Sequence, residues 1–463
     1  MPVYSIIKKS ELEGALRLDA EYYRPEYLDI NSKIKSKNSK FLGDLAKNVI
    51  CGPFGSAILQ ENYQEKGVPL ARVADLNDWF VGSDRLVFID EILSQSLKRY
   101  QVIEGDVVVS QRGTIAMFSK ITNKFPKWNI SANLVSIKKS DKINFDYLLA
   151  FLNSSYGMSQ LFRKLSGQVQ PKITTDDVKQ ILIFVPDIGK QREVALLVTS
   201  AWQKQEESKS FYSQAEQVLL KELGLEDFEE SSFAKASAGK QDDLFSIVKF
   251  SDIKKFKRMD AEYFQPKYER LTSRIKQTKH SLLGDLVSIK KGIEVGAEQY
   301  QENGKLFFRV SSLSRQGIVD KDQKYLSDEL YQKLKANFEP KAGEILLTKD
   351  ATPGIAYVLK EKVEGVISSG ILRLKLKQEI EAEYLALFIN SILGQMQAER
   401  DAGGSIISHW KPEQVKNLIV PILPQKTQQK ITELVIKSHQ AREKGKELLA
   451  QAKQKVENLI ESS

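Results

Sequence analysis

The feature that most constrains the fold of this chain is an internal repeat. Residues 18–27 read LDAEYYRPEY and residues 259–268 read MDAEYFQPKY, at an offset of 260 − 19 = 241. Farther along, DYLLAFLNS (146–154) is matched by EYLALFINS (383–391) at an offset of 384 − 147 = 237. Self-similarity at such a period predicts two copies of one architecture, with a net deletion of 241 − 237 = 4 residues in the second copy.

Each copy has the same internal order of patterns. After the aromatic phrase come short β-type runs, such as GDVVVSQRG (105–113) and GEILLTKDA (343–351), which are typical of half-buried strands. A long helix closes each copy. In residues 191–223 apolar positions recur at spacings of three and four, and most stay apolar after a shift of 237. Both stripes are narrow, as in a coiled-coil seam, so we expect the two helices to pack on each other.

These patterns predict an α+β fold class. We expect two mixed α/β domains related by a pseudo-twofold axis and separated by two long antiparallel helices that form a coiled coil. The predicted parts are a first domain with its lead-in at 1–188, a central helix at 189–223, a linker at 224–244, a second domain with its lead-in at 245–424 and a C-terminal helix at 425–463. The linker is small and polar with mixed charge.

Composition narrows the class of protein. The chain is 41% apolar and 28% charged, and no apolar run approaches the roughly 20 residues that cross a bilayer. The first residues lack the apolar core of a signal peptide, and a single cysteine excludes an internal disulfide framework. We therefore expect a cytoplasmic protein with no membrane association. The formal net charge of 69 − 60 = +9 suits a polyanionic partner, although many soluble proteins are mildly basic.

The repeated phrase has two interpretations. Asp19 and Glu21 recur as Asp260 and Glu262 and could form a catalytic carboxylate pair. General acids and bases work with a third positioned partner, however, and the repeated neighbours here are aromatic instead of His, Lys or Ser. The structural interpretation is favoured: the tyrosines anchor an extended segment, and the proline that follows them begins a helix.

The whole layout resembles the specificity subunit of type I restriction-modification systems. That family has a lead-in, a variable target-recognition domain and a long helix, and then the same series again. FGSAILQENYQEKGVPLARVADL (54–76), SGQVQPKITTDDVKQILIFVP (166–186) and GGSIISHWKPEQVKNLIVPILP (403–424) are similar to phrases of this family, and LFFRVSSL (306–313) keeps the end of the first. The copies differ in their loops, as GQVQPK and GSIISHWK do, which is expected of domains that read different sequences.

The resemblance implies a non-catalytic subunit. It would read a bipartite, asymmetric duplex DNA target with one domain per half-site, and its helices would set the spacer. It would recruit two methyltransferase subunits, which methylate adenine at N6, and restriction subunits through them. No cofactor is expected in this chain: S-adenosylmethionine would bind the methyltransferase partner, and ATP and Mg²⁺ the restriction partner.

Motifs for chemistry are missing from the sequence. It contains no Asn/Asp-Pro-Pro-Tyr/Phe adenine-methylase signature, no glycine-rich dinucleotide loop and no GxxxxGK[ST] phosphate loop. The three histidines, His280, His409 and His439, are scattered, and Cys51 does not form a metal-ligand pattern with them. We therefore predict no catalytic residue and no metal site.

Candidate DNA contacts follow from base-edge chemistry. Arg and Lys favour guanine or phosphate, and Asn and Gln favour adenine. In the first domain the predicted contacts are Arg72, Gln111, Arg112, Gln168, Gln170 and Lys172. In the second domain they are Arg309, Ser311, Arg315, Lys349, His409 and Lys411. Arg72 and Arg309 are equivalent, since 309 − 72 = 237, which suits a shared phosphate contact or a structural salt bridge. For each candidate the alternative is an ordinary surface residue.

Two other classes of function remain open at this point. A coiled-coil scaffold for protein interactions, without specific DNA recognition, is compatible with the charge and with the long helices. An enzyme such as a nuclease or a self-contained methyltransferase is disfavoured by the missing signatures. Salt-dependent binding to duplex DNA would separate the reader from the scaffold.

Overall fold

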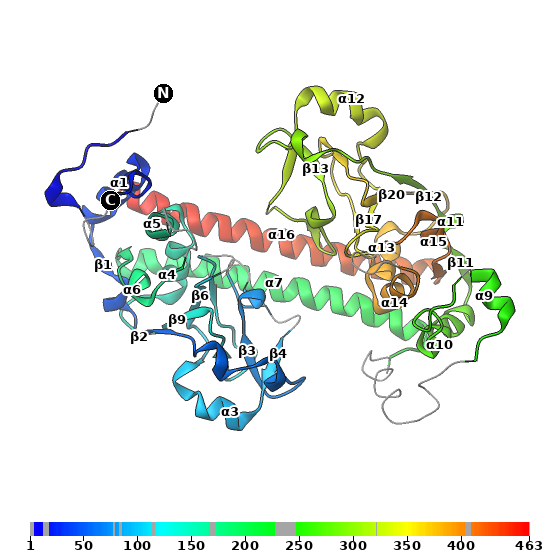
Figure 1. The fold of residues 1–463 in the computed structure, drawn as a ribbon, viewed down its shortest axis with the longest axis horizontal. Coiled ribbons are helices and arrows are strands. Elements are labelled where there is room, and N and C mark those ends of the chain that lie inside the picture. Colours follow the sequence, from blue (N-terminus) through cyan, green and yellow to red (C-terminus); the bar gives the residue numbers. More distant parts are fainter. Residues whose placement is uncertain are drawn as a thin grey trace. The chain divides into compact units, whose positions relative to one another are not determined.

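The structure is a computed structural model, and the repeat appears in it as two compact units. It describes residues 4–12, 18–76, 79–82, 86–112, 116–165, 172–226, 247–256, 258–320, 322–402 and 409–462. The first unit comprises residues 1–205 and 443–463, and the second comprises residues 206–442. Each is described by itself below (Figure 1).

The first unit contains three small sheets. Its strands are β1 (Ser39–Phe41), β2 (Asn48–Cys51), β3 (Val68–Ala71), β4 (Val87–Ile89), β5 (Gln101–Val102), β6 (Val107–Ser110), β7 (Phe118–Lys120), β8 (Trp128–Ile130), β9 (Leu134–Lys138) and β10 (Leu182–Phe184). β1 pairs with β10, a second sheet has the order β2-β9-β6-β7, and a third has the order β4-β3-β8-β5. Among the described strands of this unit, every strand pairing is antiparallel except that of β3 with β8.

The second unit repeats this plan. Its strands are β11 (His280–Leu282), β12 (Val287–Lys291), β13 (Lys305–Phe308), β14 (Leu313–Ser314), β15 (Gly317–Ile318), β16 (Lys324–Leu326), β17 (Ile345–Thr348), β18 (Ala356–Val358), β19 (Gly365–Ile367), β20 (Ile371–Leu376) and β21 (Ile419–Pro421). The orders are β11-β21, β12-β20-β17-β18 and β16-β13-β19, with a β14-β15 hairpin added. The second order matches β2-β9-β6-β7 strand for strand, and β13 is parallel to β19 as β3 is to β8. The predicted duplication of mixed α/β domains is therefore confirmed.

Short helices surround these sheets. In the first unit they are α1 (Pro25–Lys35), α2 (Leu42–Leu45), α3 (Glu91–Ser96), α4 (Phe145–Leu152), α5 (Ser155–Leu165) and α6 (Thr175–Lys179). In the second unit they are α9 (Phe250–Phe256), α10 (Pro266–Lys276), α11 (Leu283–Leu286), α12 (Asp328–Phe338), α13 (Ala382–Asn390), α14 (Ile392–Asp401) and α15 (Pro412–Lys416). The lead-in proline occupies the first position of α1 and of α10, where its missing N–H costs nothing.

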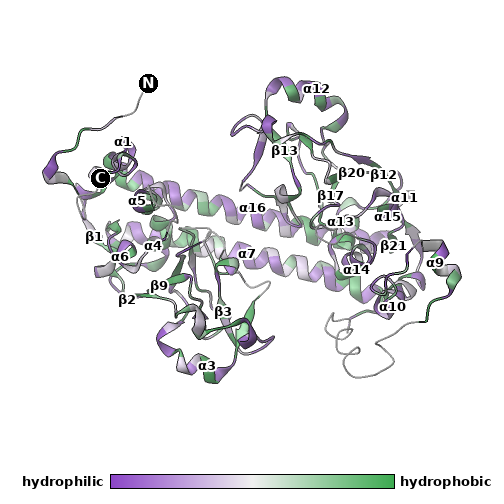
Figure 2. Ribbon diagram, in the orientation of Figure 1, coloured by the Kyte–Doolittle hydropathy of each residue, from purple (hydrophilic) through white to green (hydrophobic). Residues whose placement is uncertain are grey.

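Two long helices, α7 (Ile188–Glu222) and α16 (Gln425–Glu461), each contribute one part to each unit. Within the first unit they are antiparallel, because Gly445 lies against Ala201 while Lys455 forms an ion pair with Glu193, 2.6 Å between Nζ and Oε2. Apolar and polar residues alternate along both helices (Figure 2). The predicted packing of one narrow apolar stripe on the other is confirmed inside each unit.

The seam of the second unit contains a polar pair. Ser208 and Ser438 are both buried, their hydroxyl oxygens are 3.1 Å apart, and the Ser438 hydroxyl donates to the Ser208 carbonyl at 2.7 Å. Ala215 and Leu219 of α7 belong to the same core as the α16 residue Ile431. A hydroxyl pair at an apolar seam is satisfied in one alignment of the helices only, so this pair favours the observed register.

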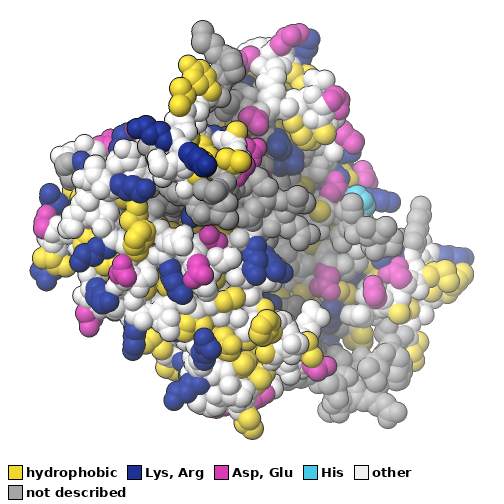
Figure 3. All heavy atoms as spheres, turned by 60° about the vertical axis from the view of Figure 1, so that its left-hand side comes forward, with side chains coloured by type: hydrophobic (Ala, Val, Ile, Leu, Met, Phe, Trp, Pro, Cys, Tyr) yellow, Lys and Arg dark blue, Asp and Glu magenta, His cyan; other side chains and the backbone are white. Residues whose placement is uncertain are grey.

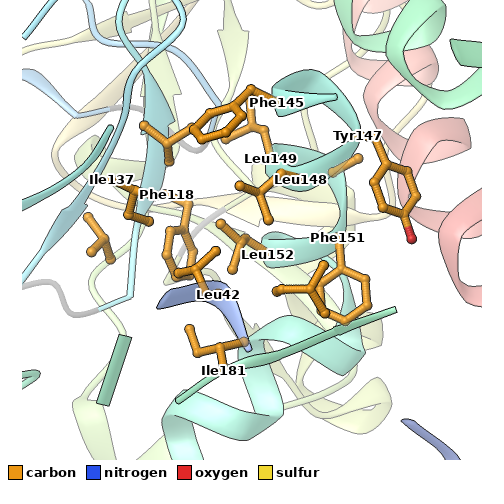
Figure 4. Close-up of a cluster of buried hydrophobic side chains, with 14 of the residues drawn as sticks. Leu42, Phe118, Ile137, Phe145, Tyr147, Leu148, Leu149, Phe151, Leu152 and Ile181 are labelled. Atoms are coloured by element: carbon orange, nitrogen blue, oxygen red, sulfur yellow. The ribbon is translucent and has the colours of Figure 1, made fainter. Parts of the chain in front are cut away.

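The core of the first unit is built around α4. In Figure 4 Leu148, Leu149 and Leu152 point toward Phe118 of β7 and Ile137 of β9. All five side chains are fully buried, so one face of the β2-β9-β6-β7 sheet is covered by apolar helix residues. This packing holds the ends of β2 and β6 in place.

A tyrosine hydroxyl closes the equivalent core in both units. The Tyr147 hydroxyl donates to the carbonyl oxygen of Phe184 at 2.7 Å, and the Tyr384 hydroxyl donates to that of Pro421 at 2.6 Å. Burial raises the pKa of both phenols above its ordinary value, so each stays a donor. The repeat thus extends to individual hydrogen bonds.

The aromatic lead-in is anchored by an arginine in each unit. The Arg163 guanidinium lies 4.1 Å from the centre of the Tyr22 ring, and its Nε donates to the Tyr22 carbonyl at 2.9 Å. Arg400 makes the same two contacts with Tyr263, at 4.4 and 3.1 Å. These contacts explain why the aromatic phrase is repeated: it attaches the start of each copy to α5 or α14.

No helix in the described part of the chain is both long enough and apolar enough to span a bilayer.

Candidate nucleic-acid interface

A groove in the first unit gathers several of the predicted DNA contacts. Its volume is about 700 Å³, and its walls are the end of β2 with residues 52–55, the end of β6, residues 132–133 and residues 172–179. A hollow of about 300 Å³ shares Pro53, Phe54 and Asn133 with it and extends to Arg72. Four cationic side chains line the larger groove: Arg99, Arg112, Lys172 and Lys179. No Asp or Glu is among the described residues that line either hollow.

Close backbone contact at Gly52 forms one side of the groove. The Gly52 amide donates to the Leu134 carbonyl at 2.8 Å, and a Cβ at this position would lie 2.0 Å from the carbonyl oxygen of Ser131. Only glycine permits this approach. The loop after β2 is therefore held against residues 131–134.

Gln111 lies at the base of the groove. Its backbone N–H donates to the backbone carbonyl of Asn133 at 2.8 Å, and its side-chain Nε2 is 3.5 Å from the Sγ of Cys51. Gln111 is buried, whereas the neighbouring Arg112 is exposed. A carboxamide at the base and guanidinium groups at the rim suit adenine and phosphate or guanine, respectively.

Arg72 forms a structural salt bridge. Its Nε and Nη2 each lie 3.0 Å from a carboxylate oxygen of Asp75, and its backbone N–H donates to the same carboxylate at 2.9 Å. The hydrogen bond with Asp75 raises the pKa of Arg72 above its ordinary value. Of the two interpretations of this position, the ion pair is the one present in the structure.

Arg309 lacks that carboxylate. Ser312 stands at the position of Asp75, since 312 − 75 = 237, and its hydroxyl accepts from the Arg309 backbone N–H at 3.1 Å. The Arg309 Nη2 donates to the Asp322 carbonyl at 2.8 Å, and its buried Nε has no hydrogen-bond partner within the described ranges. The equivalent arginines thus have different electrostatic surroundings.

Three predicted contacts of the second unit meet near the end of β17. Lys349 is buried, and its Nζ lies 2.6 Å from Asp350, whose other carboxylate oxygen is 2.7 Å from Nδ1 of the exposed His409. Burial alone would raise the pKa of Asp350, but the hydrogen bonds from Lys349 and His409 outweigh burial and lower it. Gly370 lies between this group and Val310: a Cβ built on Gly370 would be 3.5 Å from the Asp350 carboxylate and 2.8 Å from the Val310 side chain. The exposed Ser311, which follows Val310, is therefore close to the group as well.

The remaining candidates are separate. Lys411 is exposed at the start of α15. Arg315 lies beside the long helices, where its charge opposes the rise that burial causes in the pKa of Glu216. Gln168 and Gln170 fall outside the described residues.

The structure adds residues that the sequence patterns did not indicate. Arg99, Tyr100, Asn133 and Lys179 line the first groove, together with the exposed Phe54. Arg99 lies in a mixed run between α3 and β5 that gives no local signal. On the face drawn in Figure 3, Lys and Arg side chains are spread over the surface with Asp and Glu between them. Net charge alone would not have located the groove.

In the described part of the chain, no three His, Cys, Asp or Glu side chains come together as a metal-binding group.

Comparison with known proteins gives consistent matches. The model of the type I restriction modification DNA specificity domain matches residues 35–200 and 276–452, well over half of the chain. A curated Methanocaldococcus jannaschii protein, named as the specificity subunit of the type I restriction enzyme MjaX, is 20% identical over 210 residues. That match covers 43% of this chain and 49% of the relative, so the chain spans about half of the relative's length.

Two solved structures are similar in part. The type I restriction-modification S subunit from M. genitalium is 12% identical, covers 91% of this chain and 94% of its own, and has a TM-score of 0.41. The HsdS subunit from Thermoanaerobacter tengcongensis is 13% identical, with coverages of 90% and 95% and a TM-score of 0.30.

Proposed function

The chain belongs to the family of the type I restriction modification DNA specificity domain, and from this premise we propose that it reads duplex DNA as the non-catalytic specificity subunit of such a complex. One observation supports this most directly: the groove of the first unit has four cationic side chains and no carboxylate among its described lining residues. Phosphate attracts such a surface, and the groove also offers amide groups for base edges.

The target would be bipartite and asymmetric. Each unit would read one half-site, because each has a four-stranded sheet with the same strand order. In each unit a loop also follows the third strand in that order, which is β6 in the first unit and β17 in the second. The residues in that loop differ: Gln111 and Arg112 in the first unit correspond to Lys349 and Asp350 in the second, at 349 − 111 = 238. Lys favours guanine and Gln favours adenine, so the two half-sequences should not be copies of each other.

The long helices would set the spacer between the half-sites. α7 has 35 residues, so at about 1.5 Å per residue it is roughly 52 Å long. One turn of DNA is about 34–36 Å, which leaves room for unread base pairs between two grooves.

The partners would be two methyltransferase subunits and, through them, restriction subunits. The repeat supports the number two, since each unit has its own aromatic lead-in, anchored by Arg163 or by Arg400. S-adenosylmethionine, ATP and Mg²⁺ would be bound by these partners. This chain would bind DNA and position the methyltransferases on it.

The test is binding to a randomised 40-base-pair duplex, measured by fluorescence anisotropy over a range of salt. If the four groove cations each contact one phosphate, they contribute about −0.9 × 4, or roughly −3.6, to the slope of log K against log salt. Lys172→Ala should reduce the slope by about 0.9. Lys40→Ala, an exposed lysine on β1 that does not line the groove, is the charge-matched control.

A coiled-coil scaffold without DNA recognition predicts a different result. Its affinity for duplex DNA would be weak, and Lys172→Ala and Lys40→Ala would behave alike. Methylome sequencing of the source cell gives a second check: the proposal expects a split, asymmetric motif with methylated adenine in both halves, and a methylome without one would reject it.

A further inference from the structure

One side chain in the first groove is unlike its surroundings. Phe54 is 89% exposed, although it lines both the larger groove and the adjoining hollow. Its neighbours there include the cationic Arg72, Arg112 and Lys172. Exposure of a large apolar ring to water is unfavourable. Burying such a ring against a partner would stabilise the complex by about 1.5–3 kcal/mol.

The loop that presents Phe54 is held at both ends. Gly52 is pressed against the Ser131 carbonyl, and the Phe54 carbonyl accepts from the Ala57 N–H at 2.9 Å, which forms the turn η3 (Gly55–Ala57). Pro53 restricts the backbone just before the ring. The ring is therefore presented to the groove by a fixed backbone.

This loop is an addition relative to the second unit. From Gly52 to Tyr63 the chain advances 63 − 52 = 11 residues, whereas from the equivalent Gly292 to Tyr300 it advances 300 − 292 = 8. The two glycines correspond because each would place a Cβ about 2 Å from a serine carbonyl oxygen, 2.0 Å from that of Ser131 and 2.1 Å from that of Ser368. The three extra residues provide η3, which has no counterpart before η8 (Ala297–Gln299).

The second unit has no exposed aromatic ring at this place. Val295 lies at the comparable point of the shorter loop, and it packs against the core around Phe307 and Tyr331. The aromatic group is thus confined to one of the two half-site readers.

We propose that Phe54 makes an apolar contact with the bases of the first half-site, by stacking on or inserting beside a base step that is opened when the duplex enters the groove. This rests on the proposed DNA-reading function and adds to it that the two half-sites are distorted unequally. Apolar wedges between base steps and aromatic stacking on unpaired bases are general ways in which proteins hold deformed DNA. The described lining residues of the two hollows include Lys and Arg and no Asp or Glu, which favours DNA over a protein partner, although Asp75, which is not a lining residue, pairs with Arg72.

The experiment uses the full chain, with any methyltransferase subunit that co-purifies, and a duplex selected by the wild type from a randomised library. Phe54→Ala should raise the dissociation constant about 5- to 150-fold, which corresponds to the loss of roughly 1–3 kcal/mol for one base–aromatic contact. Phe54→Trp should restore most of the affinity. Ile92→Ala, which removes a side chain that is 85% exposed on α3 and lies outside the groove, should bind as the wild type does.

Two further readouts separate the outcomes. The salt slope should be the same for Phe54→Ala and the wild type, because no charge is removed. Apart from thymines opposite the methylated adenines, which a methyltransferase unpairs in both halves, thymines that react with permanganate should appear in one half-site only and should disappear with Phe54→Ala. If the wild type binds DNA while Phe54→Ala keeps its affinity and its reactive thymines, the inference is overturned and the DNA-reading function stands. If the wild type does not bind duplex DNA, both fail, and loss of a co-purifying protein with Phe54→Ala would instead assign the ring to a protein contact.

Discussion

The salt bridge between Arg72 and Asp75 offers a sharp test, because the second copy shows what replaces it. Asp75→Ser places in the first unit the residue that the second unit has at Ser312. The serine hydroxyl can still accept from the backbone N–H of residue 72, as Ser312 does from Arg309 at 3.1 Å. What is lost is the pair of 3.0 Å contacts between the guanidinium and the carboxylate.

The magnitude follows from the burial of this pair. The Asp75 side chain is 5% exposed and that of Arg72 is 26% exposed, so solvent screens the interaction only partly. A hydrogen bond to a charged group contributes about 1.5–3 kcal/mol, and we expect the free energy of unfolding of the first unit to fall by that amount. Without the Asp75 carboxylate the Arg72 guanidinium keeps its full charge beside the groove, where it lines the adjoining hollow, so DNA binding should gain about one phosphate contact and the salt slope should steepen by about 0.9.

Urea denaturation followed by tryptophan fluorescence measures the first effect. Trp79, Trp128 and Trp202 lie in the first unit, so the signal reports mainly on it. Asp29→Ser is the control, since Asp29 forms an exposed ion pair with Lys33 on α1 that solvent screens, so this change should lower the free energy of unfolding much less than Asp75→Ser does. Equal unfolding free energies for Asp75→Ser and Asp29→Ser would refute the claim that the carboxylate holds the arginine.

Four other changes test separate parts of the structure. Tyr147→Phe and Tyr384→Phe each leave a buried carbonyl unpaired, and each should lower the free energy of unfolding of its own unit by about 1–3 kcal/mol in urea denaturation; similar stability to the wild type would contradict this. Burial lowers the pKa of His439 to about 4, below the 6.5 of an exposed histidine. The neutral imidazole therefore contributes fully to the free energy of unfolding above pH 6.5, and this contribution is lost as the pH falls toward 4. His439→Leu should flatten the dependence of the unfolding temperature on pH in this range, measured by thermal unfolding. Deleting one helical turn within 202–215, with the matching turn of α16, should shorten the spacer in the methylome motif and leave both half-sequences intact; an unchanged spacer would reject the proposal that the helices set it.

Features repeated in both copies were predictable from the sequence. Apolar positions at spacings of three and four in residues 191–223 predict a long helix, and α7 (Ile188–Glu222) is that helix, because apolar spacing along a helix is a local signal. The same holds for the two tyrosines at 147 and 384, which stand at matching positions in one of the repeated phrases. A residue that recurs at the same position in both copies indicates a buried position, because only a few residue types fit a tightly packed core.

Contacts between distant segments were not predictable in this way. Arg163 and Arg400 anchor the lead-ins across 163 − 22 = 141 and 400 − 263 = 137 residues, and nothing local distinguishes them from surface arginines. Arg315, a predicted DNA contact, lies near Glu216 of α7, because the β14-β15 hairpin packs against the long helices. Whether a guanidinium is free or neutralised depends on a partner that only the fold brings close.

The differences between the two units are therefore the informative part of the repeat. Glycines at 52 and 292 are required by the same backbone approach, so the loops after β2 and β12 begin from the same frame. On that frame Arg112 gives way to Asp350, which is held by Lys349 and His409. A carboxylate repels phosphate but can accept a hydrogen bond from the amino group of cytosine, so this position should contact bases in the second unit and phosphate or guanine in the first. Exchanging the pair at 111–112 for Lys-Asp should thus change one half of the methylated motif, and an identical motif after the exchange would show that these residues do not read it.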